Sequence, residues 1–160
     1  MKPLISNIVT AVTGTDASIL AAKYAIVMAK TYNCKLSAVY VVDTATIKQL
    51  TLSKIFLQEE GAEYEKSLEA NGGRYLTFVE ELAAAKGVKI EKIIRKGAIY
   101  TEILTVADEK KANLILLGGW EKDTKTKDII GHSHREIVAN SKCSVFLVKE
   151  PEIDQIYKHL

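Results

Sequence analysis

The sequence has only two cysteines, no long apolar run and no cluster of basic residues, and each absence excludes a class of protein. Cys34 and Cys143 lie in or beside strand-like segments, so we expect two buried thiols of a cytoplasmic protein and neither a disulfide nor a metal pair. The apolar runs are far shorter than a membrane span, and residues 1–7 lead straight into a strand pattern without a signal peptide. With 22 Lys and Arg residues against 20 Asp and Glu residues, the formal net charge is +2, so we expect neither a nucleic-acid nor a membrane partner.

The motifs of several enzyme classes are also missing. The sequence contains no Gly-x-Ser-x-Gly nucleophile elbow, no His-Glu-x-x-His zinc motif and no P-loop lysine motif. His132 and His134 are two metal-binding side chains without a third, so we expect them to face solvent and predict no metal site. These absences favour a binding function over catalysis.

What the sequence does contain is a regular alternation of strand-like and helix-like segments. At 160 residues, with 48% apolar and 26% charged residues, it is long enough for one globular domain with a sizeable core. The alternation predicts an α/β fold, a single-domain three-layer sandwich around a five-stranded parallel sheet, with the common strand order 3-2-1-4-5. We place this domain at residues 1–149 and a C-terminal tail at 150–160. The predicted strands are 7–13, 35–42, 88–94, 114–117 and 144–148, and the predicted helices are 17–31, 62–86, 100–111 and 133–141.

The segment between the second and third predicted strands is harder to divide. Residues 46–58 fit either a short helix or an ordered loop. Residues 62–86 are helical in composition, but Asn71-Gly72-Gly73 falls in the middle, and each glycine costs a helix interior about 1 kcal/mol relative to alanine. We therefore expect a break or kink there, and a C-terminal cap at Gly87. The many glutamates of this segment predict a solvated face.

The polar segment after the fourth predicted strand is the first candidate for a functional site. That strand stops at Gly118-Gly119, and parallel sheets bind ligands just beyond the C-terminal ends of their strands. In the predicted order the first and fourth strands are neighbours, so residues 13–16 would face this segment. Ser133-His-Arg-Glu136 matches a capping box, which predicts a helix that starts at Ser133 and points its N-terminal dipole at a bound anion.

Several blocks of the sequence resemble the universal stress protein family, and together they cover nearly the whole chain. Residues 10–18 (TAVTGTDAS) are similar to the end of that family's first strand, and residues 40–43 (YVVD) to the end of its second. The family's nucleotide motif is Gly, two residues, Gly, nine residues, then Gly and Ser or Thr. Here Gly118, two residues, Glu121, nine residues, Gly131 and His132 keep that frame. Residues 143–148 (CSVFLV) resemble the family's closing strand.

The resemblance implies a Rossmann-like fold of the adenine nucleotide α-hydrolase type. It also implies a small cytoplasmic protein, usually dimeric, in a family of which one group binds ATP or AMP and another does not. Three positions depart from the binding pattern: Thr13 replaces an Asp that contacts adenosine, Glu121 replaces the second Gly, and His132 replaces a small hydroxyl residue. The implied nucleotide-site residues are Thr13, Val41, Leu117, Gly118, Glu121, Gly131, His132 and Ser133.

Glu121 argues against phosphate binding. Two like charges about 4 Å apart repel by about 4 kcal/mol near a protein surface, which would remove up to about three decades of affinity. The lysines nearby do not compensate, because three lysines within residues 122–127 are balanced by Glu121 and two aspartates. A bound Mg²⁺ would reverse the effect by taking Glu121 as a ligand. The sequence leaves three functions open: a dimeric stress-response module with a degenerate nucleotide site, an ATP- or AMP-binding protein or weak ATPase, and a scaffold that binds a protein partner without nucleotide.

The fifth predicted strand supplies a candidate dimer interface. Its apolar residues would form an uncharged edge of the sheet, and such edges invite pairing with another chain. We expect a homodimer in which two copies of this strand meet antiparallel across a two-fold axis, as the resemblance also implies. Ile153, Ile156 and Tyr157 of the tail would then pack on the partner. The residues of the predicted contact are Val145, Phe146, Leu147 and Val148.

Overall fold

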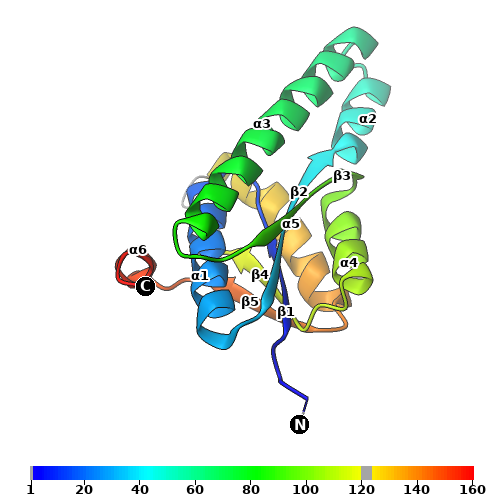
Figure 1. The fold of residues 1–160 in the computed structure, drawn as a ribbon. Coiled ribbons are helices and arrows are strands. Elements are labelled where there is room, and N and C mark those ends of the chain that lie inside the picture. Colours follow the sequence, from blue (N-terminus) through cyan, green and yellow to red (C-terminus); the bar gives the residue numbers. More distant parts are fainter. Residues whose placement is uncertain (1, 120–123) are drawn as a thin grey trace.

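A parallel five-stranded sheet with the order β3-β2-β1-β4-β5 forms the centre of the molecule (Figure 1). The computed structural model describes the backbone of residues 2–119 and 124–160 and the side chains of residues 2–119 and 131–160. The predicted fold class and strand order are confirmed. The strands are β1 (Asn7–Ala11), β2 (Lys35–Asp43), β3 (Ile90–Gly97), β4 (Leu114–Gly118) and β5 (Ser144–Val148).

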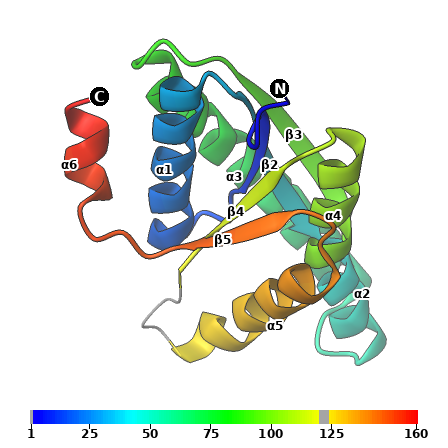
Figure 2. The same ribbon diagram turned by 90° about the horizontal axis from the view of Figure 1, so that it is seen from below.

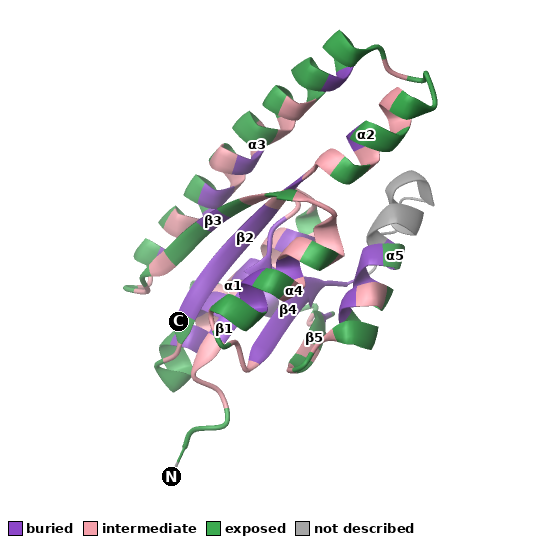
Figure 3. Ribbon diagram, turned by 90° about the vertical axis from the view of Figure 1, so that its right-hand side faces the viewer, coloured by how far each residue is buried: buried purple, intermediate pink, exposed green. Residues whose placement is uncertain are grey.

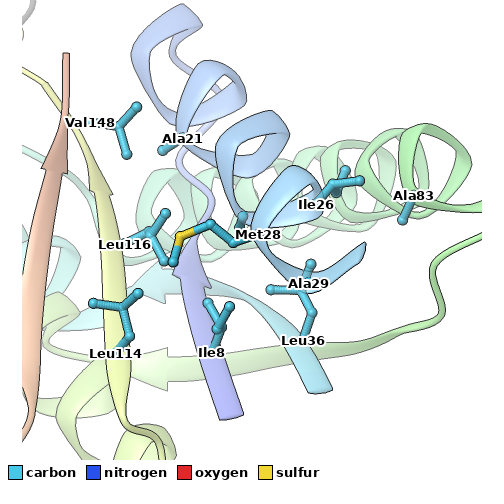
Figure 4. Packing of buried hydrophobic residues seen from close by; sticks show 11 residues of the cluster. Ile8, Ala21, Ile26, Met28, Ala29, Leu36, Ala83, Leu114, Leu116 and Val148 are labelled. Carbon is cyan, nitrogen blue, oxygen red and sulfur yellow. The ribbon is translucent and has the colours of Figure 1, made fainter. Parts of the chain in front are cut away.

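Helices cover both faces of this sheet (Figure 2), as right-handed crossovers require. Strand residues alternate between the faces: Ile8 and Leu116 pack toward α1, whereas Val9 and Ile115 pack toward α4. Figure 4 shows the buried cluster on the α1 side of the sheet, in which Met28 of α1 lies over Ile8 and Leu116. The helices are α1 (Asp16–Tyr32), α2 (Thr44–Leu52), α3 (Gln58–Ala84), α4 (Ile99–Glu109), α5 (Thr124–Asn140) and α6 (Ile153–Lys158).

The α2 and α3 helices form a hairpin that extends beyond the sheet (Figure 3). The sequence left residues 46–58 open between helix and loop, and α2 occupies Thr44–Leu52 of this region. The predicted break at Asn71–Gly73 is wrong, because α3 runs without interruption from Gln58 to Ala84. Gly72 serves a different purpose: a Cβ atom there would lie 2.3 Å from the Tyr40 ring. The glycine allows helix and strand to approach closely, and this packing outweighs its poor helix propensity.

The helix predicted to start at Ser133 begins nine residues earlier, at Thr124. Ser133 is therefore an interior residue of α5 and not its N-cap, and the helix dipole does not begin there. Burial explains the difference, since Ser133, His134 and Ile137 are all buried and lie on one side of a continuous helix. The capping-box pattern matched a stretch that instead packs against the sheet.

The C-terminal tail forms α6 and packs on the chain's own α1. Ile153 is buried, the Lys23 ammonium lies 2.6 Å from the Asp154 carboxylate, and the Tyr157 hydroxyl donates a 2.6 Å hydrogen bond to the Leu82 carbonyl. The predicted contact of the tail with a partner stays a prediction, and the exposed Ile156 is the tail residue available for it. Within residues 2–119 and 124–160, no helix has the length and apolarity needed to cross a membrane.

Cys34 and Cys143 are free thiols that are only half-buried, whereas the sequence predicted buried ones. Burial raises the pKa of the Cys34 thiol. The Cys34 thiol also donates a hydrogen bond to the Ile5 carbonyl at an S···O distance of 3.3 Å. This thiol is therefore held in its neutral form as part of the core.

Candidate functional site

The C-terminal ends of β1 and β4 meet beside the start of α1, as the predicted strand order requires. A Cβ atom on Gly118 would lie 2.7 Å from the carbonyl carbon of Ala17. The missing side chain of Gly118 thus lets β4 end directly against the first turn of α1. The packing of β4 against α1 therefore requires a glycine at position 118 whether or not a ligand binds.

The loop between β1 and α1 is held by a small network of hydroxyl groups. The Thr15 side chain caps α1 by accepting a hydrogen bond from the Ser18 backbone N–H at 3.1 Å. Ser18 Oγ donates to the Thr15 carbonyl at 3.0 Å and accepts from the Thr13 N–H at 3.1 Å. Thr13 Oγ1 lies 3.0 Å from Thr15 Oγ1. Thr15 is thus the N-cap of α1, and Thr13 belongs to the same network.

A half-open cavity of about 290 Å³ lies beside this loop, between the ends of β1 and β2 and helices α2, α3 and α4. Its walls are mainly apolar, with side chains from every one of these elements. Polar groups are few and come from Thr13, Thr15, Asp43 and Thr46, with Tyr40 and Tyr64 adding ring hydroxyls. The apolar lining consists of Val12, Val39, Val41, Ile47, Leu68, Ile99 and Ile103.

A second, more open hollow of about 400 Å³ adjoins the cavity. It lies between the start of α2, the start of α4 and the described part of α5. Its polar lining includes Gln49, Tyr100, His132 and Ser133, and the Tyr100 and His132 rings meet edge to face with centroids 6.2 Å apart. Asp43, Thr46 and Ile99 line both spaces, which makes them the boundary between an apolar and a polar compartment.

Asp43 is the last residue of β2 and the N-cap of α2. Its Oδ1 accepts from the Thr46 N–H at 3.0 Å, and its Oδ2 accepts from the Thr46 hydroxyl at 2.7 Å. Among the described lining residues of the two spaces, Asp43 is the only acidic one, and none is a lysine or arginine.

His134 is buried in the structure, so the expectation that it faces solvent is wrong; His132 is exposed as expected. The His134 Nε2 atom lies 2.8 Å from the Gly118 carbonyl oxygen. Because a carbonyl oxygen only accepts, Nε2 must carry the proton. His134 therefore fixes the end of β4 to α5, which is a structural role that the sequence did not reveal.

The structure divides the predicted site residues among several places. Thr13 and Val41 line the mainly apolar cavity, and His132 and Ser133 line the more open hollow. Leu117 and Gly118 border an interstice of only about 10 Å³ near Thr13 and His134. Gly131 is buried within α5, and Glu121 lies outside the described residues.

No sequence pattern indicated the cavity walls that α2, α3 and α4 contribute. Tyr64, Leu68 and Ile99 carry no motif, and only the packing of three helices brings them to the strand ends. Asp43 did carry a signal, because an acidic residue at the C-terminal end of a parallel strand lies at the ligand-binding edge. Tyr40 completes the floor of the cavity, and its burial, together with the nearby Tyr75 and Tyr64 hydroxyls, raises its pKa.

Comparisons with known proteins agree on one family. The sequence model described as "Universal stress protein family" matches residues 5–149. "Universal stress protein MJ0531" of Methanocaldococcus jannaschii is 32% identical over 155 residues, which cover 93% of this chain and 85% of that protein.

Solved structures share the fold. The hypothetical protein MJ0577 aligns with a TM-score of 0.76 and 19% identity, over 92% of this chain and 98% of that one. A universal stress protein in complex with cAMP aligns with a TM-score of 0.66 and 22% identity, over 90% of this chain and 96% of that one. At these identities the likeness establishes the architecture.

Proposed function

Because this chain belongs to the universal stress protein family, we propose that it is a stress-response signalling module that binds an adenine nucleotide at the C-terminal edge of its sheet. The observation that carries the proposal is the mainly apolar cavity of about 290 Å³ beside a more open polar hollow. Ligand sites are concave, mostly apolar, and oriented by a few polar groups. This pair of spaces has those properties, and it lies where parallel sheets bind ligands.

The two spaces differ in a way that suits the two ends of a nucleotide. Apolar walls from Val39, Val41 and Leu68 fit the faces of a purine ring, while the open hollow offers the His132 and Ser133 side chains. That a solved protein of the same fold is in complex with cAMP supports the choice of an adenine nucleotide.

The charges in and near the site favour few phosphates. Asp43 lines both spaces, and Glu121 occupies the motif position that a glycine holds in the nucleotide-binding pattern. Each carboxylate repels phosphate, and the repulsion grows with phosphate charge. AMP therefore binds more tightly than ATP in the absence of a divalent cation, and Mg²⁺ reduces the difference.

Isothermal titration calorimetry with AMP, ADP, ATP and cAMP, each with and without Mg²⁺, tests the proposal. We expect a dissociation constant below about 100 μM, equivalent to more than about 5 kcal/mol, for at least AMP. Val41→Phe fills the cavity and abolishes binding, whereas Ile94→Phe, at an exposed position of β3, leaves it unchanged. No heat from the wild-type protein with any of the four ligands would leave the nucleotide-independent scaffold as the function.

We further propose that the module acts as a homodimer through β5. This strand pairs only with β4 among the described strands and exposes Phe146 and Leu147, 38% and 36% exposed respectively. A two-fold antiparallel contact would cover both side chains and satisfy the open backbone edge.

A further inference from the structure

We propose that Asp43 recognises the ribose hydroxyls of the bound nucleotide and makes the site selective for ribonucleotides. This inference rests on the proposed function and adds which part of the nucleotide is bound at the boundary between the two spaces. It follows from where the Asp43 carboxylate lies, how it is held, and what surrounds it.

The carboxylate is fixed before any ligand arrives. It ends β2 and caps α2, and both of its oxygens are hydrogen-bonded to Thr46, at 3.0 Å to the N–H and 2.7 Å to the hydroxyl. A carboxylate has about four acceptor positions, so these two bonds leave further lone pairs for a ligand. The group therefore presents acceptors of set direction at the boundary.

A ligand in this position must supply hydrogen-bond donors. Asp43 is only partly exposed, it forms no ion pair with any residue that the structure describes, and no described residue lining either space is a lysine or arginine. A ligand that displaces water from a carboxylate without replacing its hydrogen bonds loses affinity, because a charged acceptor is then left unsatisfied. Ligands with hydroxyl or amino groups at this point avoid that loss.

The arrangement of the two spaces places the ribose of a bound nucleotide at Asp43. The purine fits the mainly apolar cavity, and the phosphate end fits the more open hollow where His132 and Ser133 lie. The sugar must then cross the boundary at Asp43 and Thr46. Its two neighbouring hydroxyls are donors, and an acidic residue at the end of the strand beside the first one makes the same contact in dinucleotide-binding sheets.

The test compares three ligands that differ only in these hydroxyls: AMP, 2′-deoxy-AMP and 2′,3′-dideoxy-AMP. Calorimetric titration of the wild-type protein is expected to give AMP at least about tenfold tighter binding than dideoxy-AMP, with deoxy-AMP between them, since each lost bond is to a charged acceptor. Asp43→Asn keeps a helix N-cap and is expected to reduce the AMP-to-dideoxy-AMP ratio to near one. Loss of the phosphate repulsion affects all three ligands equally and cancels in this ratio.

Asp16→Asn is the matched control, because it removes the same charge at the same edge of the sheet from an exposed residue that lines neither space. It should leave the ratio unchanged. Circular dichroism and thermal unfolding check that α2 remains folded in Asp43→Asn. Equal wild-type affinity for AMP and dideoxy-AMP, or a ratio that Asp43→Asn does not alter, overturns this inference alone. If none of the three ligands binds, the proposed function fails and the inference fails with it.

Discussion

The Tyr40 ring of β2 lies directly against the backbone of Gly72 in α3, where a Cβ atom would be 2.3 Å from ring carbon Cδ1. The same ring stacks on Tyr75, with centroids 6.3 Å apart. Tyr75 in turn covers Gly14, which has a positive φ of 82° in the β1–α1 loop. These contacts fix α3 relative to the strand ends, so that Tyr64 and Leu68 form one wall of the cavity.

Substitution of the two adjacent glycines of α3 should have opposite effects on stability. Gly72→Ala forces the buried Tyr40 ring to move and is expected to lower the free energy of unfolding by about 1–3 kcal/mol. A Cβ atom at Gly73 meets nothing within 4 Å, so Gly73→Ala should raise it by about 0.5–1 kcal/mol through helix propensity. Urea denaturation measures both, and stabilisation by both substitutions would show that Tyr40 does not require the glycine.

Removal of the buried hydroxyl group should have different effects on stability at Thr10 and at Ser18. Thr10 is fully buried, and its Oγ1 makes no hydrogen bond with any residue that the structure describes. Thr10→Val should therefore leave the free energy of unfolding unchanged or raise it by up to about 1 kcal/mol. Ser18→Ala removes a buried hydroxyl that makes two hydrogen bonds, and should lower it by about 1–2 kcal/mol. Thermal unfolding distinguishes the pair, and a marked loss in Thr10→Val would contradict the assignment.

The proposed dimer predicts a change in mass on substitution of one β5 residue. Phe146→Asp places a charge on the apolar edge and should convert a dimer into a monomer, as measured by size-exclusion chromatography with light scattering. Phe78→Asp is the control, because Phe78 is similarly exposed but lies on α3. A wild-type monomer at micromolar concentration would rule out the β5 interface.

Glu121 predicts how affinity depends on phosphate. Glu121→Gly restores the glycine of the nucleotide motif and removes a carboxylate, so ATP should bind more tightly by about one to three decades. Adenosine, which has no phosphate, is the internal control and should bind equally to both proteins. Equal ATP affinity would show that the Glu121 side chain does not approach the phosphates. Isothermal titration calorimetry of the wild type and Glu121→Gly with ATP and with adenosine measures both affinities.

The burial of Tyr40 predicts a dependence of stability on alkaline pH. Burial raises its pKa above the ordinary value of 10.0, so the folded protein favours the neutral phenol. This contribution to stability is complete below the pKa of the unfolded chain and is lost as the pH rises through the folded pKa. The free energy of unfolding should therefore fall more steeply above pH 10 in the wild type than in Tyr40→Phe. Identical slopes would mean that Tyr40 ionises as freely in the folded protein as in the unfolded one.

Hydrophobic patterning predicted the strands, and the common order of five-stranded α/β sheets then gave their arrangement and the edge of the sheet that carries the site. Leu114 to Leu117 is an example: a short run that is apolar throughout and stops at a glycine pair is typical of a strand buried on both faces. The same patterning also placed the loop at residues 13–16 beside Gly118. These features depend on local sequence and on the general rules of parallel sheets.

Local patterns failed where tertiary packing decides. Gly72 resembled a helix breaker because the ring it accommodates is 32 residues away in the sequence, at Tyr40. Ser133 resembled an N-cap because nothing in its local pattern indicates that the helix already begins at Thr124. The cavity walls from α2 and α3 could not be predicted at all, since Tyr64 and Leu68 become site residues only through the close approach of α3 to β2.

Most side chains that line the mainly apolar cavity come from one uninterrupted stretch of chain, from Val39 in β2 to Leu68 in α3, whereas His132 and Ser133 belong to α5. Under the proposed function, the residues that contact the base and those that contact the phosphates therefore belong to separate segments of the chain. Mutation can alter one without disturbing the other. Exchanging residues 39–68 between family members is therefore expected to transfer the preference for the base.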